Sequence, residues 1–122
     1  MAGYLKRSLS EEYFVVLSGP NPPDHLGFQS DRIQILWNNS DQSWSDPGQH
    51  LHTNSDEVYL VLEGAIVFEV EDERFTIAAG EICLVPAGTF HAIVAVETPI
   101  KSLVIRAPAS QDKVYRDGYV EQ

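Results

Sequence analysis

Hydrophobic residues along this chain fall into short runs, and the runs have the length of β-strands. In residues 31–37 the apolar side chains of Ile33, Ile35 and Trp37 alternate with more polar positions, a pattern typical of a strand with one buried face. Glycine and proline separate the runs, and no segment shows a helical period. The pattern therefore predicts an all-β barrel or sandwich. The expected strands cover residues 13–17, 31–37, 57–62, 65–70, 74–78, 81–85, 91–96 and 101–107.

Two of these runs, residues 13–17 and 91–96, are apolar at nearly every position, so we expect strands that are buried on both faces. The interior of a barrel covers only one face of each strand. The other apolar face must then be covered from outside, and a second copy of the chain is the usual solution. The pattern therefore predicts a homodimer.

The segments between the runs predict turns, loops and two polar ends. Glu63-Gly64 is expected to end one strand, and the acidic residues 71–73 to form the exposed tip of a hairpin. Residues 18–30 are rich in glycine and proline and predict a loop, in which His25 is interpreted as an exposed histidine. We expect a single domain over residues 1–122, with an N-terminal arm over residues 1–12 and a polar C-terminal tail over residues 108–122.

Composition narrows the classes of function. The formal net charge is −10, which argues against nucleic acid and against an anionic membrane surface as partners. No apolar run approaches the length of a membrane span. Cys83 is the only cysteine, so no internal disulfide is possible, and a cytoplasmic location is expected. Because Cys83 lies in an apolar strand, we expect a packed thiol.

Three of the four histidines fall into a pattern that suits a metal site. His50 and His52 are two residues apart, so on a strand both side chains leave the same face. Glu57 follows after a short polar break, and His91 lies downstream. Buried histidines often only satisfy hydrogen bonds, but a buried Glu57 would need a proton, hydrogen bonds or a cation. Two or three imidazoles with one carboxylate suit a first-row transition metal.

These residues also carry a resemblance to a known family. His50, His52, Glu57 and Gly64 match the first cupin motif, G-x5-H-x-H-x3,4-E-x6-G, except that Trp44 replaces its opening glycine. The second motif, G-x5-P-x-G-x2-H-x3-N, is matched at four positions, with an alanine in place of the final asparagine; the matching residues are Gly80, Pro86, Gly88 and His91. The chain thus resembles a small single-domain cupin.

The resemblance implies a double-stranded β-helix, or jelly-roll, barrel that holds one divalent transition metal per chain. Its ligands would be His50, His52, Glu57 and His91, and the ion could be Fe, Mn, Ni, Co or Zn. Cupins with these ligands include dioxygenases, isomerases and lyases, and other cupins only bind ligands. The fold therefore does not fix the function.

We expect a metalloenzyme of the dioxygenase type, acting on a small neutral or singly anionic molecule that chelates the metal. A non-redox isomerase or lyase and a binding protein without turnover stay open as alternatives. Tyr59 shares a strand face with Glu57 and is the candidate for proton relay, with interior packing as the alternative. Gln34, Trp37 and Phe90 are the expected substrate-binding residues. Gln34 and Tyr59 would line the face opposite the metal ligands, with Trp37, Trp44 or Phe90 nearer the mouth.

Overall fold

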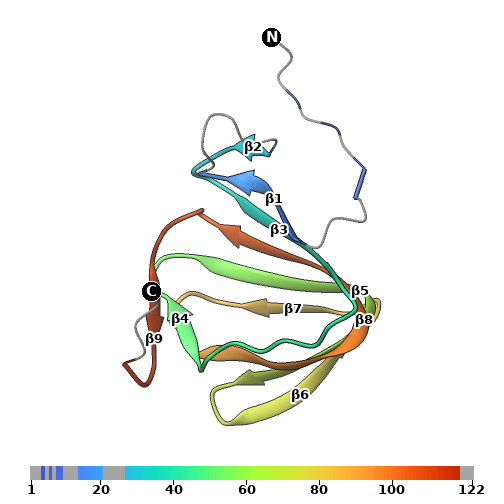
Figure 1. Cartoon of the computed structure of the whole chain (residues 1–122). Coiled ribbons are helices and arrows are strands. Elements are labelled where there is room, and N and C mark those ends of the chain that lie inside the picture. The colour runs from blue at the N-terminus through green and yellow to red at the C-terminus, as the bar shows by residue number, and fades with distance from the viewer. Residues whose placement is uncertain (1–3, 5, 7, 10–13, 21–26, 119–122) are drawn as a thin grey trace.

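The computed structural model describes residues 4, 6, 8–9, 14–20 and 27–118, and within these ranges it is built of β-strands. His25 and much of the expected N-terminal arm lie outside the described residues. No helix long and apolar enough to cross a bilayer occurs in the described part of the chain. The strands curve around a common interior (Figure 1), which confirms the predicted all-β fold. They are β1 (Phe14–Gly19), β2 (Phe28–Gln29), β3 (Gln34–Ser40), β4 (His50–His52), β5 (Asp56–Val70), β6 (Glu73–Ala78), β7 (Ile82–Val85), β8 (His91–Ala107) and β9 (Lys113–Tyr115).

The two longest strands of the barrel, β5 and β8, are antiparallel and pair with each other. They pair from Asp56 opposite Ala107 to Val70 opposite His91, with register shifts along the way. Each of them replaces two shorter strands that the pattern predicted, so the strand end expected at Gly64 is wrong. Gly64 instead sits within a bent strand at φ 79°. A Cβ at this position would lie 2.5 Å from the carbonyl oxygen of Pro99, so only glycine lets β5 and β8 approach this closely.

The sheet continues from β8 through β3 and β1 to β2, and β6 and β7 pair with β5. Strand β3 begins three residues later than expected. Leu36 packs against the core, whereas Trp37 points to the opposite face of β3 and is buried there. The expectation that residues 13–17 are buried on both faces is wrong for β1, because Phe14 is 47% exposed and, of the apolar residues in this strand, only Val15 is buried.

The core fills the space between the curved strands. Residues 91–96 are mostly buried, as their apolar pattern predicted. Cys83 packs against the core, which confirms the packed thiol, and burial raises its pKa. The core cluster consists of Tyr59, Val61, Ile66, Phe68, Ile77, Val85, Ile93, Val96, Ile100 and Val104.

The segment expected to be a polar tail contains a strand of the barrel. Strand β9 pairs antiparallel with β4, with His50 opposite Tyr115 and His52 opposite Lys113. On its other side β4 meets β8, with His50 opposite His91. Residues 113–115 therefore lie directly beside the two histidines of β4, a position that the polar composition of this segment did not indicate.

Candidate metal centre

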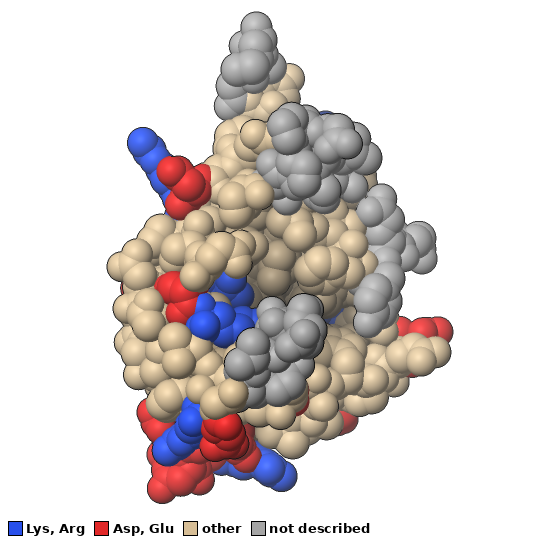
Figure 2. Space-filling view, turned by 60° about the vertical axis from the view of Figure 1, so that its left-hand side comes forward, with Lys and Arg blue, Asp and Glu red and all other residues tan. Residues whose placement is uncertain are grey.

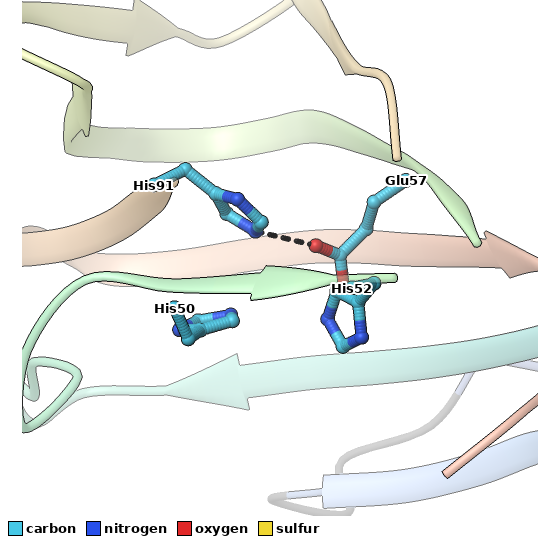
Figure 3. Close-up of side chains that lie close together, drawn as sticks. All are labelled: His50, His52, Glu57 and His91. Atoms are coloured by element: carbon cyan, nitrogen blue, oxygen red, sulfur yellow. Dashed lines mark hydrogen bonds and ion pairs between the residues drawn. The ribbon is translucent and has the colours of Figure 1, made fainter. Parts of the chain in front are cut away.

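Three strands bring the four predicted metal ligands together. His50 and His52 come from β4, Glu57 from the start of β5 and His91 from the first residue of β8. The alternation of a strand places both β4 histidines on its inner face. All four side chains are buried, and they converge inside the barrel (Figure 3). Their ligand atoms lie within 4.8 Å of one another, so one ion could contact all four after small side-chain shifts.

Glu57 is the centre of a hydrogen-bond network. Its Oε1 lies 2.7 Å from His91 Nε2 and accepts a hydrogen bond of 3.0 Å from Tyr59 Oη. His91 Nδ1 donates to the carbonyl oxygen of Thr89 at 2.8 Å, which orients the ring so that Nε2 faces the cluster. His52 Nε2 lies 3.6 Å from Glu57 Oε2. Both carboxylate oxygens are thus directed toward imidazole nitrogens.

Arg106 supplies the counter-charge of Glu57. Its Nε and Nη2 donate to Oε2 at 3.2 and 3.0 Å, and its Nη1 donates to Gln34 Oε1 at 2.6 Å. Burial alone would raise the pKa of Glu57, but the His91 hydrogen bond and the Arg106 charge outweigh burial and lower it to about 2. Glu57 thus has the hydrogen bonds and the cation that its burial was expected to need, so its burial alone does not require a metal.

The imidazoles provide the stronger reason to place a metal here. Among the described residues, His50 Nδ1 and His52 Nε2 are buried nitrogens without a hydrogen-bond partner. Such atoms are rare, because each one costs the free energy of its lost hydration. Burial, together with the nearby charge of Lys113, lowers the pKa of His50 to about 3, so its ring is neutral at pH 7. Neutral imidazoles with unused nitrogens beside a carboxylate fit a divalent transition metal.

Asp112 holds His52 in place from the C-terminal segment. Its Oδ1 accepts a hydrogen bond of 2.9 Å from His52 Nδ1, so the free Nε2 is turned to the cluster. Its Oδ2 accepts from the backbone N–H groups of Asn54 and Ser55 at 2.8 and 3.0 Å. Burial alone would raise the pKa of Asp112, but these hydrogen bonds outweigh burial and lower it. Sequence reasoning missed this residue, because nothing in the polar segment marks one aspartate as a partner of a histidine 60 positions away.

A cavity of about 160 Å³ opens beside His50 and Glu57. Figure 2 shows a hollow in one face of the molecule with Lys and Arg atoms in and beside it. Two aromatic residues expected near the pocket from the sequence, Tyr59 and Trp44, line the cavity. The full set of lining residues is Phe14, Leu36, Asn38, Trp44, Asp46, His50, Glu57, Tyr59, Ile93, Val104, Arg106 and Lys113.

The three expected substrate-binding residues lie in different environments. Gln34 contacts Arg106, which lines the cavity. Trp37 is outside the lining, because it lies on the opposite face of β3 from Leu36. Phe90 is also outside the lining, and its ring centroid is 5.0 Å from the guanidinium carbon of Arg116. The geometry therefore links only Gln34 to the cavity, and does so through Arg106.

Asp46 is a second carboxyl group on the cavity wall, and sequence reasoning did not single it out. Its Oδ2 accepts a hydrogen bond of 2.8 Å from the backbone N–H of Ile93, and its own N–H donates to the Ile93 carbonyl at 2.8 Å. These two bonds fix the loop to β8. Burial raises the pKa of Asp46. Burial and the nearby Glu57 charge also raise the pKa of Tyr59 well above its usual value, so Tyr59 keeps its proton.

Comparison with known proteins supports this picture of the fold. A sequence model of the cupin domain matches residues 41–106, more than half of the chain, and this range contains all four candidate ligands. No curated protein sequence matches the chain.

Several solved structures share the fold at low sequence identity. KdgF from Halomonas sp. is 23% identical over 68% of this chain and 76% of its own, with a TM-score of 0.59. A variant of Streptomyces PAC13, a nucleoside dehydratase, determined with uridine is 18% identical over 94% and 91%, with a TM-score of 0.67. The DMSP lyase DddQ from Ruegeria pomeroyi is 21% identical over 88% and 53%, with a TM-score of 0.63.

Proposed function

The chain belongs to the cupin domain family, and we propose that it is an enzyme holding one divalent transition metal through His50, His52, Glu57 and His91. The ion is Fe, Mn, Ni, Co or Zn, all of which accept imidazole and carboxylate ligands. The observation that carries this proposal is the pair of buried, unpartnered imidazole nitrogens of His50 and His52 in the cluster beside an open cavity. A purely structural histidine cluster would be expected to satisfy those atoms.

The reaction class that the cavity supports best is a non-redox proton transfer on a small organic molecule, as in a lyase, dehydratase or isomerase. When bound, the metal would act as a Lewis acid that polarises an oxygen of the substrate. Asp46 and Tyr59 both line the cavity, and carboxyl and phenol groups are side chains that general acid–base catalysis uses. Two solved structures with the same fold, a nucleoside dehydratase and a DMSP lyase, belong to this class of enzyme, and a variant of the dehydratase was determined with uridine.

The two residues suit different roles in such a reaction. Tyr59 stays protonated, and its hydroxyl donates a hydrogen bond to Glu57 Oε1. Its ring centroid lies 4.7 Å from that of Phe68, so the hydroxyl donates from a fixed position. One carboxyl oxygen of Asp46, Oδ2, accepts the hydrogen bond of the Ile93 amide, and a carboxyl group at a cavity wall suits a general base or acid. Packing alone remains the alternative for Tyr59.

The experiment compares metals and oxygen. Metal-free protein is reconstituted separately with Zn(II) and Fe(II) and assayed with and without oxygen on small hydroxy acids, keto acids, diketones and keto-sugars. We expect turnover with Zn(II) under anaerobic conditions, because the Lewis-acid role needs no redox change. Asp46→Asn should lower kcat by about 10²-fold or more, as loss of general acid–base catalysis does, whereas Asp41→Asn at an exposed site should not.

Two outcomes would contradict the proposal. Oxygen uptake confined to the Fe(II) form would instead favour the dioxygenase expected from the sequence. No turnover with either metal on any of these substrates would favour a binding protein without catalysis.

A further inference from the structure

Three polar side chains, Gln49, Glu71 and Arg116, join segments that are far apart in the chain, and we call them the surface cluster. Gln49 directly precedes β4, Glu71 lies at the tip between β5 and β6, and Arg116 directly follows β9. From the sequence, residues 71–73 were expected only as an exposed acidic turn. In the structure, this tip is bonded to the chain on both sides of it.

Gln49 uses its whole side-chain amide in the surface cluster. Its Nε2 donates to the carbonyl oxygen of Glu71 at 2.6 Å and to Glu69 Oε1 at 2.8 Å, and its Oε1 accepts from Arg116 Nη1 at 2.7 Å. Its backbone carbonyl accepts from the Arg116 N–H at 2.9 Å. Because Gln49 directly precedes His50, these four bonds fix the point at which β4 begins.

Glu71 connects the same cluster to the residue before His91. Its N–H donates to the carbonyl oxygen of Phe90 at 3.0 Å, and its Oε2 lies 3.2 Å from Arg116 Nη1. Glu71 has a φ of 54°, a left-handed conformation that is uncommon for a residue other than glycine or asparagine. The bonds of its N–H, carbonyl and carboxylate groups offset the cost of this conformation, so they hold the tip against Phe90.

The two ligands next to the surface cluster have little other support for their separation. Strand β4 has three residues and pairs with β8 at a single position, His50 opposite His91. The centroids of the two rings are 4.5 Å apart. Nδ1 of His50 has no hydrogen-bond partner among the described residues, so the backbone on either side must position this ring.

We propose that Arg116 is a positioning residue of the metal site, which sets the separation of His50 and His91 through the surface cluster. Its side chain contacts Gln49, which precedes one ligand, and lies over the ring of Phe90, which precedes the other. A lone exposed ion pair would contribute little, but the contacts of Arg116 form a network. The proposal rests on the proposed function, because it concerns the ligands of the same site.

The test measures zinc affinity by competition with a chromophoric chelator. Arg116→Ala should bind zinc about tenfold more weakly, at the lower end of the usual effect of removing an outer partner of a metal ligand. The control is Arg32→Ala, which removes the same charge at an exposed position outside the cluster and should bind as the wild type does. Gln49→Ala should also weaken binding, and the double variant should lose no more than the weaker-binding single variant, because both changes break one network.

Nitrogen-15 NMR of the imidazole rings gives a second measurement, on metal-free protein. Arg116→Ala should shift the ring signals of His50 and His91, whereas those of His52 should stay in place, because Asp112 holds that ring. Unchanged signals of His50 and His91 would overturn the proposal, and equal shifts of all three histidines would show a general structural role instead.

Unchanged zinc affinity in Arg116→Ala, or losses that add in the double variant, would also overturn the proposal. A wild type that binds no zinc would contradict the proposed function itself. The ring signals of the metal-free protein would then decide alone whether Arg116 positions His50 and His91.

Discussion

Asp112 contacts one candidate metal ligand, His52, and holds that ligand in position for the whole site. It is bonded to His52 Nδ1 and to two backbone N–H groups of the loop that leads from β4 to β5. A carboxylate in this position fixes the orientation of a ligating histidine and raises its basicity. The residue is thus a positioning residue, which would act on a bound metal through His52.

This role predicts the behaviour of two variants. Asp112→Ala should lower the affinity for zinc by about 10- to 100-fold, the usual effect of removing such a partner. Asp112→Asn should lose less, because its amide oxygen still accepts the His52 hydrogen bond. Competition with a chromophoric chelator measures the affinity, and Asp41→Ala, at an exposed position, is the matched control.

Stability is measured alongside, because Asp112 also binds the loop backbone. If Asp112→Ala melts at a lower temperature but binds zinc as tightly as the Asp41→Ala control, the residue is structural only, and the positioning role is contradicted.

The four candidate ligands could be predicted from the sequence because they are tied to local spacing. His50 and His52 share a strand face by alternation alone, and Glu57 and His91 lie at motif positions. Arg106, Asp46 and Asp112 could not be predicted, since each meets its partner across many intervening residues. Arg106, for example, contacts Glu57 because β8 and β5 pair with these two residues directly opposite one another.

At the scale of elements, the strand pattern was visible but its continuity was not. Glu63-Gly64 was expected to end one strand, and residues 97–100 were expected to separate the strands over residues 91–96 and 101–107. In the structure, β5 and β8 continue through these positions. The pairing register shifts there, and such irregularities bend the two strands. Bending is what closes the barrel around the ligands, so the same residues that obscured the strands help to form the site.

Strand β9 was missed for a related reason. Lys113-Val114-Tyr115 is too short to show a hydrophobic pattern, and it is a strand only because β4 offers an edge for pairing. This short element nevertheless contributes Lys113 to the cavity and places Tyr115 beside His50, with 5.6 Å between their ring centroids.

At the scale of the whole molecule, the homodimer remains a prediction, but the structure moves its expected interface to another surface. Residues 91–96 are mostly covered within the chain, so they leave little surface to bury. Large apolar side chains are exposed instead on β7 and the adjoining part of β5, where Ile82 is 60%, Leu84 71% and Leu62 46% exposed. The register places Ile82 beside Leu60 and Leu84 beside Val58 on one outer face, a patch suited to a second copy.

Light scattering tests the dimer directly. We expect a mass of twice the 13.6 kDa of one chain at micromolar concentration, and a single-chain mass for Leu84→Glu, whose charge would be buried in the interface. A single-chain mass for the wild type would contradict the dimer. A dimer that persists in Leu84→Glu would place the interface elsewhere.

The most direct test of the metal centre is elemental analysis of protein loaded with a divalent metal and then freed of excess ions. The wild type should retain one ion per chain. His52→Ala and His91→Ala should retain less than about a tenth of that, with circular dichroism still showing a folded barrel, because apolar burial supplies most of its stability. A wild type that retains no metal, or a His91→Ala variant that retains as much as the wild type, would contradict the site described above.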